Sequence, residues 1–317
     1  MLDVVTIGET MLRFTPASDQ TLEQAEHYRV DTGGAESNVA IALARLGWKT
    51  AWISRLPDNP LGRRLAGRIR AHGVDVSRII WASSGRVGLW YFEPPVPPRP
   101  GQAYYDRAGS TFSLIDPDEV DWDFVRTARW LHLTGITPAL SPQCRALVHR
   151  ALEEVANAPI IVSFDVNYRS RLWTPAEARA ALEPTLHRVT MVFCPLRDAC
   201  ILFNDAGDAE SVARTWARRF GARVVVITAG EAGAVAFDGT AHFLPRRYPV
   251  QVVDPLGTGD AFAAGFIGGY LEGGTGTGLA WAAGMAALKQ SYLGDAPWCT
   301  REDLLHLISA ESTGIQR

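Results

Sequence analysis

The strongest local signal in the sequence is Val252-Val-Asp-Pro-Leu-Gly-Thr-Gly-Asp-Ala-Phe-Ala-Ala-Gly265. An extended apolar approach leads into Gly257-Thr258-Gly259, and Asp260 then opens a segment rich in alanine and phenylalanine that we expect to be helical. Glycines on either side of a small residue let backbone N–H groups converge at a helix N-terminus, where unpaired donors and the helix dipole favour an anion. The stretch therefore predicts a phosphate site with a carboxylate beside it.

That carboxylate, Asp260, has two possible roles. Next to a phosphate site it can orient an attacking hydroxyl and accept its proton, while the backbone amides stabilise charge on the transferring group. Aspartate also caps helices commonly, so Asp260 could have only that structural role. The spacing of the residues leaves both interpretations open.

On the N-terminal side of this stretch, short β-branched runs alternate with helix-like segments. The runs that we expect to be strands are residues 4–7, 51–54, 130–133, 159–164, 189–193 and 223–228. Ser141-Pro142 and Thr174-Pro175 each place a capping hydroxyl before a proline, and Glu177 completes a capping box with Thr174. This alternation predicts an α/β fold whose mostly parallel sheet carries helices on both faces.

Two segments, residues 10–32 and 86–112, lack this helical periodicity. The second contains Leu89-Trp90-Tyr91-Phe92, Tyr104-Tyr105 and a proline-rich stretch between them. We interpret both segments as extra antiparallel strands of a small sheet that projects from the main domain, although plain surface hairpins are an alternative. Such a sheet would expose more aromatic surface than a monomer usually tolerates, so we expect a homo-oligomer, either a dimer through these sheets or a higher assembly.

The composition limits the possible partners. The 317 residues include 31 basic and 34 acidic side chains, a formal net charge of -3, so we expect neither a nucleic acid nor a membrane partner. Lysine occurs only at positions 49 and 289, and the other 29 basic residues are arginine. The four cysteines lack zinc-site spacing and the N-terminus lacks a signal-peptide pattern, so we expect a cytoplasmic protein.

Three motifs resemble those of one enzyme family. Asp254-Pro-Leu-Gly-Thr-Gly-Asp260 resembles the D-x-x-G-[AT]-G-D signature of the ribokinase-like, or PfkB, carbohydrate kinases. The stretch Gly33-Gly34-Ala35-Glu36-Ser37-Asn38-Val39-Ala40 is similar to the first signature of that family, and Thr228-Ala-Gly-Glu-Ala-Gly233 to its T-x-G-x-x-G nucleotide loop. The motifs occur in the order and spacing of the family, and the resemblance covers nearly the whole chain.

The resemblance implies a Rossmann-like αβα sandwich with a small β-sheet lid, and transfer of the γ-phosphate of ATP to a sugar hydroxyl with Mg²⁺. The core would comprise residues 1–9, 33–85 and 113–317, and the lid residues 10–32 and 86–112. Asp260 would be the base, with Gly257, Thr258 and Gly259 as the anion hole. The implied ATP-binding residues are Thr228, Gly230, Gly233, Asp254, Gly257 and Gly259. The implied substrate-binding residues are Gly33, Gly34, Asn38, Tyr91, Tyr105, Arg107, Ile136, Asn167, Arg169 and Asp260.

Within the family, the chain is most similar to the branch that phosphorylates 2-keto-3-deoxygluconate. Residues 131–142, 165–173 and 104–110 are typical of that branch. The carboxylate of this sugar suits a planar guanidinium, for which Arg107 and Arg169 are candidates. Arg107 could instead lie on the solvent face of a lid strand, Arg169 in a surface loop, and Asn167 in a turn. Either Tyr91 or Trp90 would line the sugar.

One departure from the family pattern leaves the metal site unassigned. Many relatives carry an N-x-x-E motif that supports Mg²⁺ and phosphate, whereas this chain has Pro195 in place of the asparagine and Asp198 as the nearest acid. The alternatives are a kinase for a neutral sugar such as fructose or ribose, a kinase for another keto-deoxy sugar acid such as the galacto epimer, or a non-catalytic sugar-binding module on the same fold.

Overall fold

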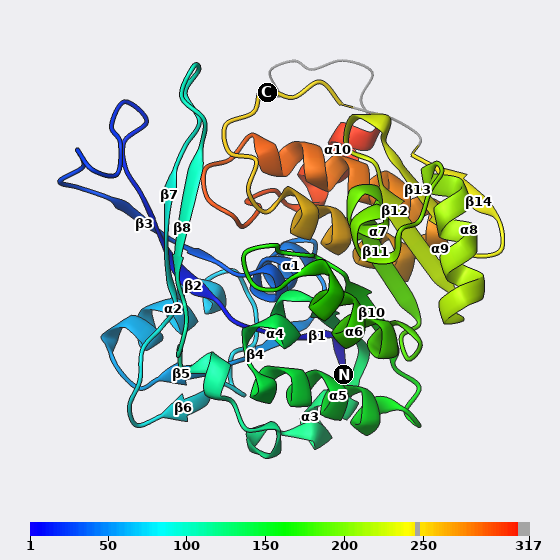
Figure 1. Ribbon diagram of the computed structural model, residues 1–317, viewed down its shortest axis with the longest axis horizontal. Helices are drawn as coiled ribbons and strands as arrows, with labels where there is room; N and C mark the ends of the chain where they lie inside the picture. Colours follow the sequence, from blue (N-terminus) through cyan, green and yellow to red (C-terminus); the bar gives the residue numbers. More distant parts are fainter. Residues whose placement is uncertain (245–247, 310–317) are drawn as a thin grey trace.

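The central element of the computed structural model, which describes residues 1–244 and 248–309, is an eight-stranded sheet (Figure 1). Its strand order is β14-β13-β12-β11-β10-β9-β1-β4. The strands are β1 Leu2–Ile7, β4 Thr50–Ile53, β9 Ala128–Thr134, β10 Ile161–Asp165, β11 Met191–Pro195, β12 Val224–Thr228, β13 Ala234–Phe237 and β14 Ala241–Phe243. The strands from β12 to β4 pair in parallel, and β13 and β14 are antiparallel at one edge. Each of the expected strand runs overlaps a strand of the parallel part.

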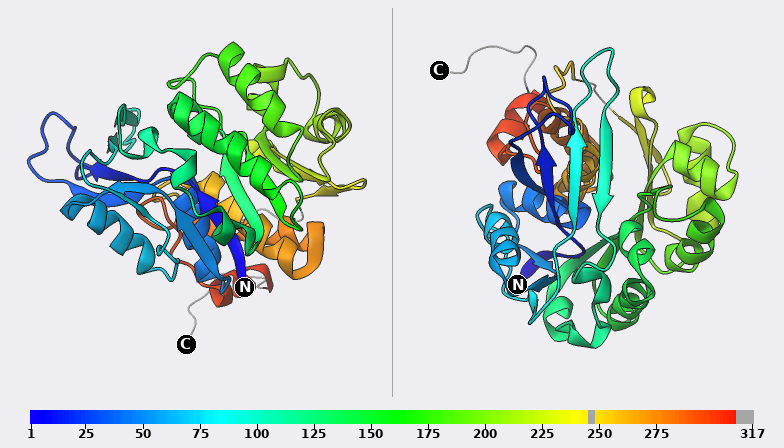
Figure 2. Two further views of the ribbon diagram at one scale, coloured as in Figure 1. Left: turned by 90° about the horizontal axis from the view of Figure 1, so that it is seen from below. Right: turned by 60° about the vertical axis from the view of Figure 1, so that its left-hand side comes forward.

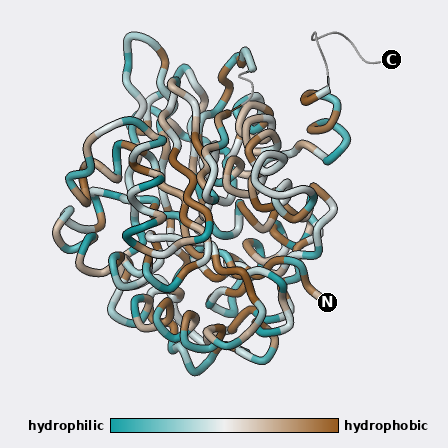
Figure 3. Tube along the Cα trace, turned by 90° about the vertical axis from the view of Figure 1, so that its right-hand side faces the viewer, coloured by the Kyte–Doolittle hydropathy of each residue, from teal (hydrophilic) through white to brown (hydrophobic). Residues whose placement is uncertain are grey.

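Side chains that alternate along the strands form two hydrophobic cores, one on each face of the sheet. Val5 and Val225 belong to one core, and their neighbours Val4 and Val224 belong to the other. The first face is covered by α5 Pro142–Val155, α6 Pro175–Leu186, α7 Leu196–Phe203 and α8 Ala209–Phe220, and the second by α1 Ala35–Arg45, α9 Thr258–Gln290 and α10 Arg301–Ser309. Burial on both faces explains why these strands are continuous apolar runs. Figure 3 shows the same apolar stretches along the interior of the trace.

The helices begin where the sequence pattern predicts. Ser141 caps α5 by accepting a hydrogen bond from the Cys144 N–H at 3.0 Å, with proline at the first helical position. Thr174 and Glu177 form the expected capping box at the start of α6. The remaining elements are α2 Pro60–Arg70, α3 Trp122–Arg126, α4 Ile136–Leu140, the parallel pair β5 Arg55–Pro57 and β6 Ile80–Ala82, and the 3-10 turns η1 Phe112–Leu114, η2 Pro117–Glu119 and η3 Gly230–Ala232.

A second sheet of four strands stands off the core (Figure 2). Its order is β3-β2-β7-β8, from β2 Met11–Thr15, β3 Arg29–Gly33, β7 Leu89–Glu93 and β8 Gln102–Asp106. The two hairpins are antiparallel as expected, but their central strands β2 and β7 pair in parallel, so the expectation of an all-antiparallel sheet is wrong. The first strands of the two hairpins, β2 and β7, both run away from the core, so they have the same direction.

We call this four-stranded sheet the lid. Aromatic side chains cover one of its faces. Tyr91 stacks on Phe14 with ring centroids 5.3 Å apart, and Tyr28 packs edge-on against both rings. Association of two chains through the lid stays a prediction, as does the division of the chain into a core domain and a lid domain. Among the described residues, no helix has the length and apolar character needed to cross a bilayer.

Candidate active site

Helix α9 begins at the glycine-rich motif and presents free amides. Gly257 precedes the first turn with φ of 78°, a left-handed conformation that favours glycine, and a Cβ there would collide with the carbonyl oxygen of Asp295. The N–H groups of the first three helical residues, 258–260, have no partner within the helix. Thr258 N–H makes only a long contact of 3.4 Å, to the Pro255 carbonyl. The motif therefore leaves backbone amides free at the start of α9, as the expected anion site requires, and the binding of an anion there stays a prediction.

A cleft of about 880 Å³ lies between this helix terminus and the lid. It brings together many residues that the sequence predicted for the site: Gly33, Gly34, Asn38, Tyr105, Arg107, Ile136, Arg169, Gly257 and Asp260. Thr258 and Gly259 follow Gly257 directly in the chain and are the first two residues of α9. The functional roles of these residues stay predictions.

Asp260 is the third residue of α9 and its carboxylate is oriented by a neighbouring helix. Asn38 in α1 donates a hydrogen bond from Nδ2 to Asp260 Oδ2 at 2.7 Å. Gly257 occupies the capping position, so the interpretation of Asp260 as a helix cap does not fit this geometry. Burial raises the pKa of Asp260, and the Asn38 hydrogen bond and the positive charges of Arg169 and Lys289 oppose that rise. A carboxylate with a raised pKa beside free amides is suited to accept a proton.

The first glycine motif allows close packing at the opposite wall of the cleft. A Cβ on Gly33 would collide with the Asp295 carboxylate and press on the Trp90 indole nitrogen, and a Cβ on Gly34 would collide with the Glu9 carbonyl oxygen. Only glycine therefore fits at either position. The lack of side chains thus lets Asp295 and Glu9 pack directly on this part of the cleft wall.

The lid lines the cleft with Trp90 rather than Tyr91. Trp90 and Tyr105 stack with ring planes 5° apart and centroids 5.5 Å apart, and both line the cleft. Successive side chains of a strand point to opposite faces, so Tyr91 lies on the aromatic outer face with Phe14. Of the two residues predicted to line the sugar, Trp90 is thus the one that lines the cleft, and a role of either residue in substrate binding stays a prediction.

Arg107 lines the cleft, but an acid already neutralises it. Its Nε donates to Glu9 Oε2 at 2.8 Å, and its Nη2 contacts the same oxygen. The other carboxylate oxygen of Glu9, Oε1, is buried without a hydrogen-bond partner in the described part of the chain, as is the indole Nε1 of Trp90. Sequence reasoning missed Glu9, because no motif marks an acid whose partner is 98 residues away.

Arg169 lies on the loop that follows β10. It is exposed, lines the cleft, and donates its described hydrogen bond, of 3.3 Å, to the carbonyl of the adjacent Tyr168. Asn167 turns this loop with φ of 40°, and its N–H donates to Asp165 Oδ1 at 3.1 Å. Asn167 is not among the residues that line the cleft, and its Nδ2 donates to Asp165 Oδ2 at 3.4 Å. Its position agrees with the alternative of a turn residue, and its role in substrate binding stays a prediction. Arg171 bridges to the lid by donating to the Ala103 carbonyl.

Two acids lie where the N-x-x-E motif would act. Pro195 ends β11 and Asp198 is buried in the first turn of α7. Burial, together with the charges of Asp260 and Asp198, raises the pKa of Asp165 to about 7, and the charge of Arg169 opposes this rise. Within residues 1–244 and 248–309, no group of three acid, histidine or cysteine side chains is arranged to hold a metal ion.

Four of the expected nucleotide residues, Thr228, Gly230, Gly233 and Asp254, are not among the residues that line the cleft. Thr228 ends β12, and Gly230 and Gly233 flank the turn η3 with φ of 56° and 96°. Their role in ATP binding stays a prediction. Asp254 is buried behind the glycine loop and braces it, because its Oδ1 accepts the Leu256 N–H at 3.1 Å. Its role in ATP binding stays a prediction.

Comparisons with known proteins agree with this architecture. Residues 1–298 match the family model described as pfkB family carbohydrate kinase. A 2-dehydro-3-deoxygalactonokinase from Haloferax volcanii is 38% identical over 316 residues, covering 99% of each chain. A 2-dehydro-3-deoxygluconokinase from Bacillus subtilis is 32% identical over 324 residues, covering 100% of this chain and 98% of that one.

A solved structure is similar over the same extent. The crystal structure of a 2-dehydro-3-deoxygluconokinase from Thermotoga maritima has a TM-score of 0.92 at 31% identity and covers 98% of both chains. The predicted fold class and the predicted family resemblance are therefore confirmed.

The glycine-loop geometry predicts the effect of Gly257→Ala. The added methyl group must displace the Asp295 carbonyl and adopt a left-handed backbone, so we expect a loss of about 1–3 kcal/mol of stability. Gly276→Ala, in an uncrowded part of α9, is the matched control. Equal urea-unfolding midpoints for the two variants would contradict the assignment of strain to Gly257.

The raised pKa of Asp165 predicts that the difference in stability between the parent protein and the Asp165→Asn variant changes with pH. In the folded chain the neutral carboxyl is favoured, so its contribution to stability is present below about pH 4 and is lost as pH rises through about 7. Asp165→Asn avoids that loss, and its melting temperature relative to the parent should rise between about pH 4 and 8. Asp208→Asn, at a helix cap where the hydrogen bond from the Ser211 N–H lowers the pKa of the carboxyl, should show no change relative to the parent between about pH 4 and 8, because that carboxyl titrates below about pH 4. A difference that does not vary with pH would refute the shift at Asp165.

Proposed function

The chain belongs to the pfkB family of carbohydrate kinases, and on this premise we propose that it phosphorylates 2-keto-3-deoxygluconate with ATP, giving 2-keto-3-deoxy-6-phosphogluconate. The observation that carries the proposal is one cleft lined by Gly257 at the free end of α9, by the Asp260 carboxylate and by Arg169. The names of the Bacillus subtilis and Thermotoga maritima relatives support the sugar.

The proposed reaction uses groups that the chain already orients. The terminal hydroxyl oxygen of the sugar attacks the γ-phosphorus, the bond to the bridging oxygen of ADP breaks, and the hydroxyl proton passes to Asp260. Asn38 holds the carboxylate in place through its 2.7 Å hydrogen bond. The amides at the start of α9 stabilise negative charge on the transferring group. The lid covers the cleft and limits the access of water, which would otherwise hydrolyse ATP.

We propose that Mg²⁺ enters with ATP and is held mostly by its phosphates. Magnesium commonly takes only one or two protein carboxylates and keeps several waters, which agrees with two acids and no larger ligand group in the described residues. Asp165 and Asp198 fit this role because the charge of Asp198 raises the pKa of Asp165, and a nearby cation would favour both ionised forms. The ion would neutralise charge on the β- and γ-phosphates.

Arg169 is better suited than Arg107 to the sugar carboxylate. Arg107 already pairs with Glu9, whereas the described hydrogen bond of Arg169 goes only to a backbone carbonyl. A free guanidinium can form the bidentate pair that a carboxylate prefers. Glu9 Oε1 and Trp90 Nε1, an unpaired acceptor and an unpaired donor in the same cleft, are suited to sugar hydroxyl and carbonyl groups.

A second candidate substrate is the galacto epimer, 2-keto-3-deoxygalactonate. It is favoured by the 38% identity to the Haloferax volcanii 2-dehydro-3-deoxygalactonokinase. The epimers share the carboxylate, so Arg169 would serve both sugars. They differ in the direction of one hydroxyl group, which Glu9 Oε1 and Trp90 Nε1 could distinguish.

Removal of the proposed base should abolish turnover without preventing binding. For Asp260→Asn we expect kcat to fall about 10²- to 10⁴-fold in a coupled ADP-release assay. Calorimetry should still detect sugar and ATP, because the isosteric amide keeps the cleft intact. Near-parental kcat in the variant would reject Asp260 as the base, and a parent protein that binds sugar without releasing ADP would favour the non-catalytic sugar-binding module.

A substrate panel tests the acid-sugar proposal. We expect kcat/KM to be higher for 2-keto-3-deoxygluconate or its galacto epimer than for fructose or ribose. Arg169→Ala should raise KM for the acid sugar about tenfold or more, since it removes a charge-assisted pair. Arg63→Ala removes an exposed arginine outside the cleft and should leave KM unchanged. Preference for fructose together with a harmless Arg169 change would overturn the acid-sugar proposal.

A further inference from the structure

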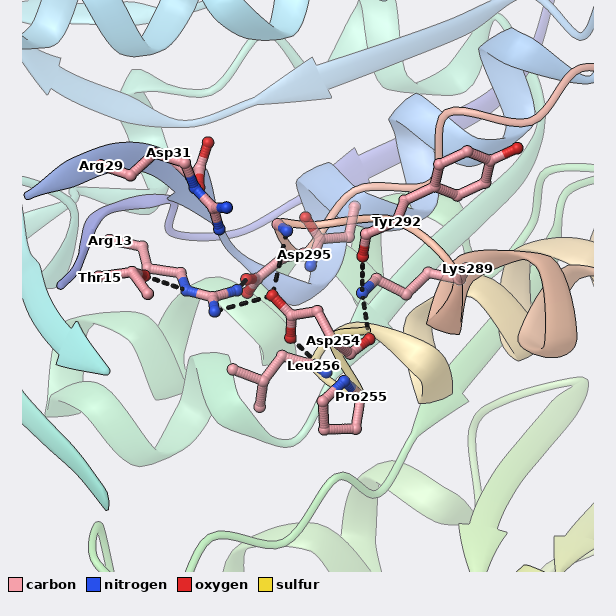
Figure 4. Close-up of polar contacts among 12 residues, drawn as sticks. Arg13, Thr15, Arg29, Asp31, Asp254, Pro255, Leu256, Lys289, Tyr292 and Asp295 are labelled. Atoms are coloured by element: carbon pink, nitrogen blue, oxygen red, sulfur yellow. Dashed lines mark hydrogen bonds and ion pairs between the residues drawn. The ribbon is translucent and has the colours of Figure 1, made fainter. Parts of the chain in front are cut away.

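Lys289 carries a buried charge that the proposed mechanism does not use. It lies near the end of α9 with no exposed surface, whereas Lys49, the other lysine, is exposed. Its Nζ donates to the Asp254 carbonyl at 2.8 Å and contacts the Tyr292 carbonyl at 3.5 Å (Figure 4). Its described hydrogen-bond partners are therefore backbone oxygens rather than a carboxylate. Burial of an ammonium group is costly unless its partners compensate for the lost water.

The two carbonyls belong to two loops that meet at Gly257. Asp254 begins the first loop, residues 254–257, and braces it by accepting the Leu256 N–H. The second loop, residues 292–295, packs on Gly257 through the Asp295 carbonyl. The loops are also joined by the Gly294 N–H, which donates to Asp254 Oδ2 at 3.0 Å.

The junction lies behind the face that lines the cleft. Leu256, Gly257 and Asp295 line the cleft, but Asp254 and Lys289 do not. The Lys289 ammonium thus binds the 254–257 loop on the side away from the cleft. The same loop leads directly into the free amides at the start of α9. Because the first loop spans only four residues, movement of the Asp254 carbonyl would shift the start of the helix.

Charge balance favours an ammonium at this point. Arg13 from the lid pairs with Asp254 Oδ2 at 2.8 Å and with Asp295 Oδ1 at 2.6 Å, so one guanidinium faces two carboxylates. Lys289 supplies the second positive charge. Burial and the Arg13 charge lower its pKa, and Asp254, Asp295 and Asp260 raise it. Lys289 in turn helps to keep Asp260 ionised.

We propose that Lys289 is a positioning residue for phosphoryl transfer, because its ammonium holds the 254–257 and 292–295 loops together and thereby fixes the amides at the start of α9. This inference rests on the proposed kinase activity. Lys289 does not line the cleft, so it acts through the loops. The amides must be fixed before the reaction if they are to stabilise the transition state without reorganisation.

Lys289→Met tests the proposal, because methionine fills similar space but cannot donate to the two carbonyls. We expect kcat to fall at least tenfold while KM for the sugar changes less than about twofold, since Gly34, Asn38 and Arg169 are not disturbed. Lys49→Met is the matched control and should match the parent. Parental kcat in folded Lys289→Met would overturn the proposal. A parent enzyme without ADP release on any sugar would instead refute the kinase activity, and the inference with it.

Chemical rescue gives a second readout that a purely structural role would not produce. Lys289→Ala removes the side chain beyond Cβ and leaves the two carbonyls without their donor, so an ammonium ion can enter the space and ammonium chloride should restore part of kcat in a saturable manner in sodium buffer. Tetramethylammonium chloride at equal ionic strength is too bulky and should not. Thermal melting sets an assay temperature at which each variant is folded, which keeps the test valid if Lys289→Met is unstable. Equal response to both salts, or none, in folded Lys289→Ala would contradict the proposal.

Discussion

The buried ion pairs of Arg13 with Asp254 and Asp295 connect the lid, the glycine loop and the C-terminal loop (Figure 4). Arg13 lies on the lid strand β2 and is almost completely buried, with its guanidinium 4.5 Å from the centre of the Phe92 ring and 5.2 Å from that of Trp90. A buried charge without its partner would cost several kcal/mol. The lid is therefore held against the core by electrostatics as well as by apolar packing, and the anion site is shaped by residues from three distant parts of the chain.

The phosphate site relies on backbone geometry, and the side chains around it serve to hold that geometry. Gly257 needs a left-handed conformation and permits contact with Asp295, while Asp254 and Lys289 brace the loop from behind. A helix terminus can bind phosphate without a lysine that reaches into the cleft. This explains how a chain with two lysines can carry a phosphate site, one being exposed and the other pointing into the protein.

The sequence predicted the features that depend on local order and left out those that depend on distant pairing. The parallel strands, the Thr174–Glu177 capping box and the glycine loop follow from short patterns of residues. Arg13 and Asp295 are 282 positions apart, and no local pattern shows that they meet. Sequence patterns left open whether Trp90 or Tyr91 lines the cleft, because the period-two pattern does not tell which face of a lid strand meets the core. They also left open whether Asn167 is a turn residue, because the positive φ of its loop and its contact with Asp165 are tertiary features.

Asp295 gives the clearest physical link between the sugar side and the phosphate side of the cleft. Its carboxylate pairs with Arg13 and lies against Gly33, and its carbonyl lies against Gly257. Burial raises its pKa to about 6 while Arg13 opposes that rise, so the carboxylate is mostly ionised at neutral pH and the pair with the lid persists. Packed contacts on both sides of Asp295 leave it little freedom, so this single residue holds the lid strand β2, Gly33 and Gly257 in one fixed arrangement.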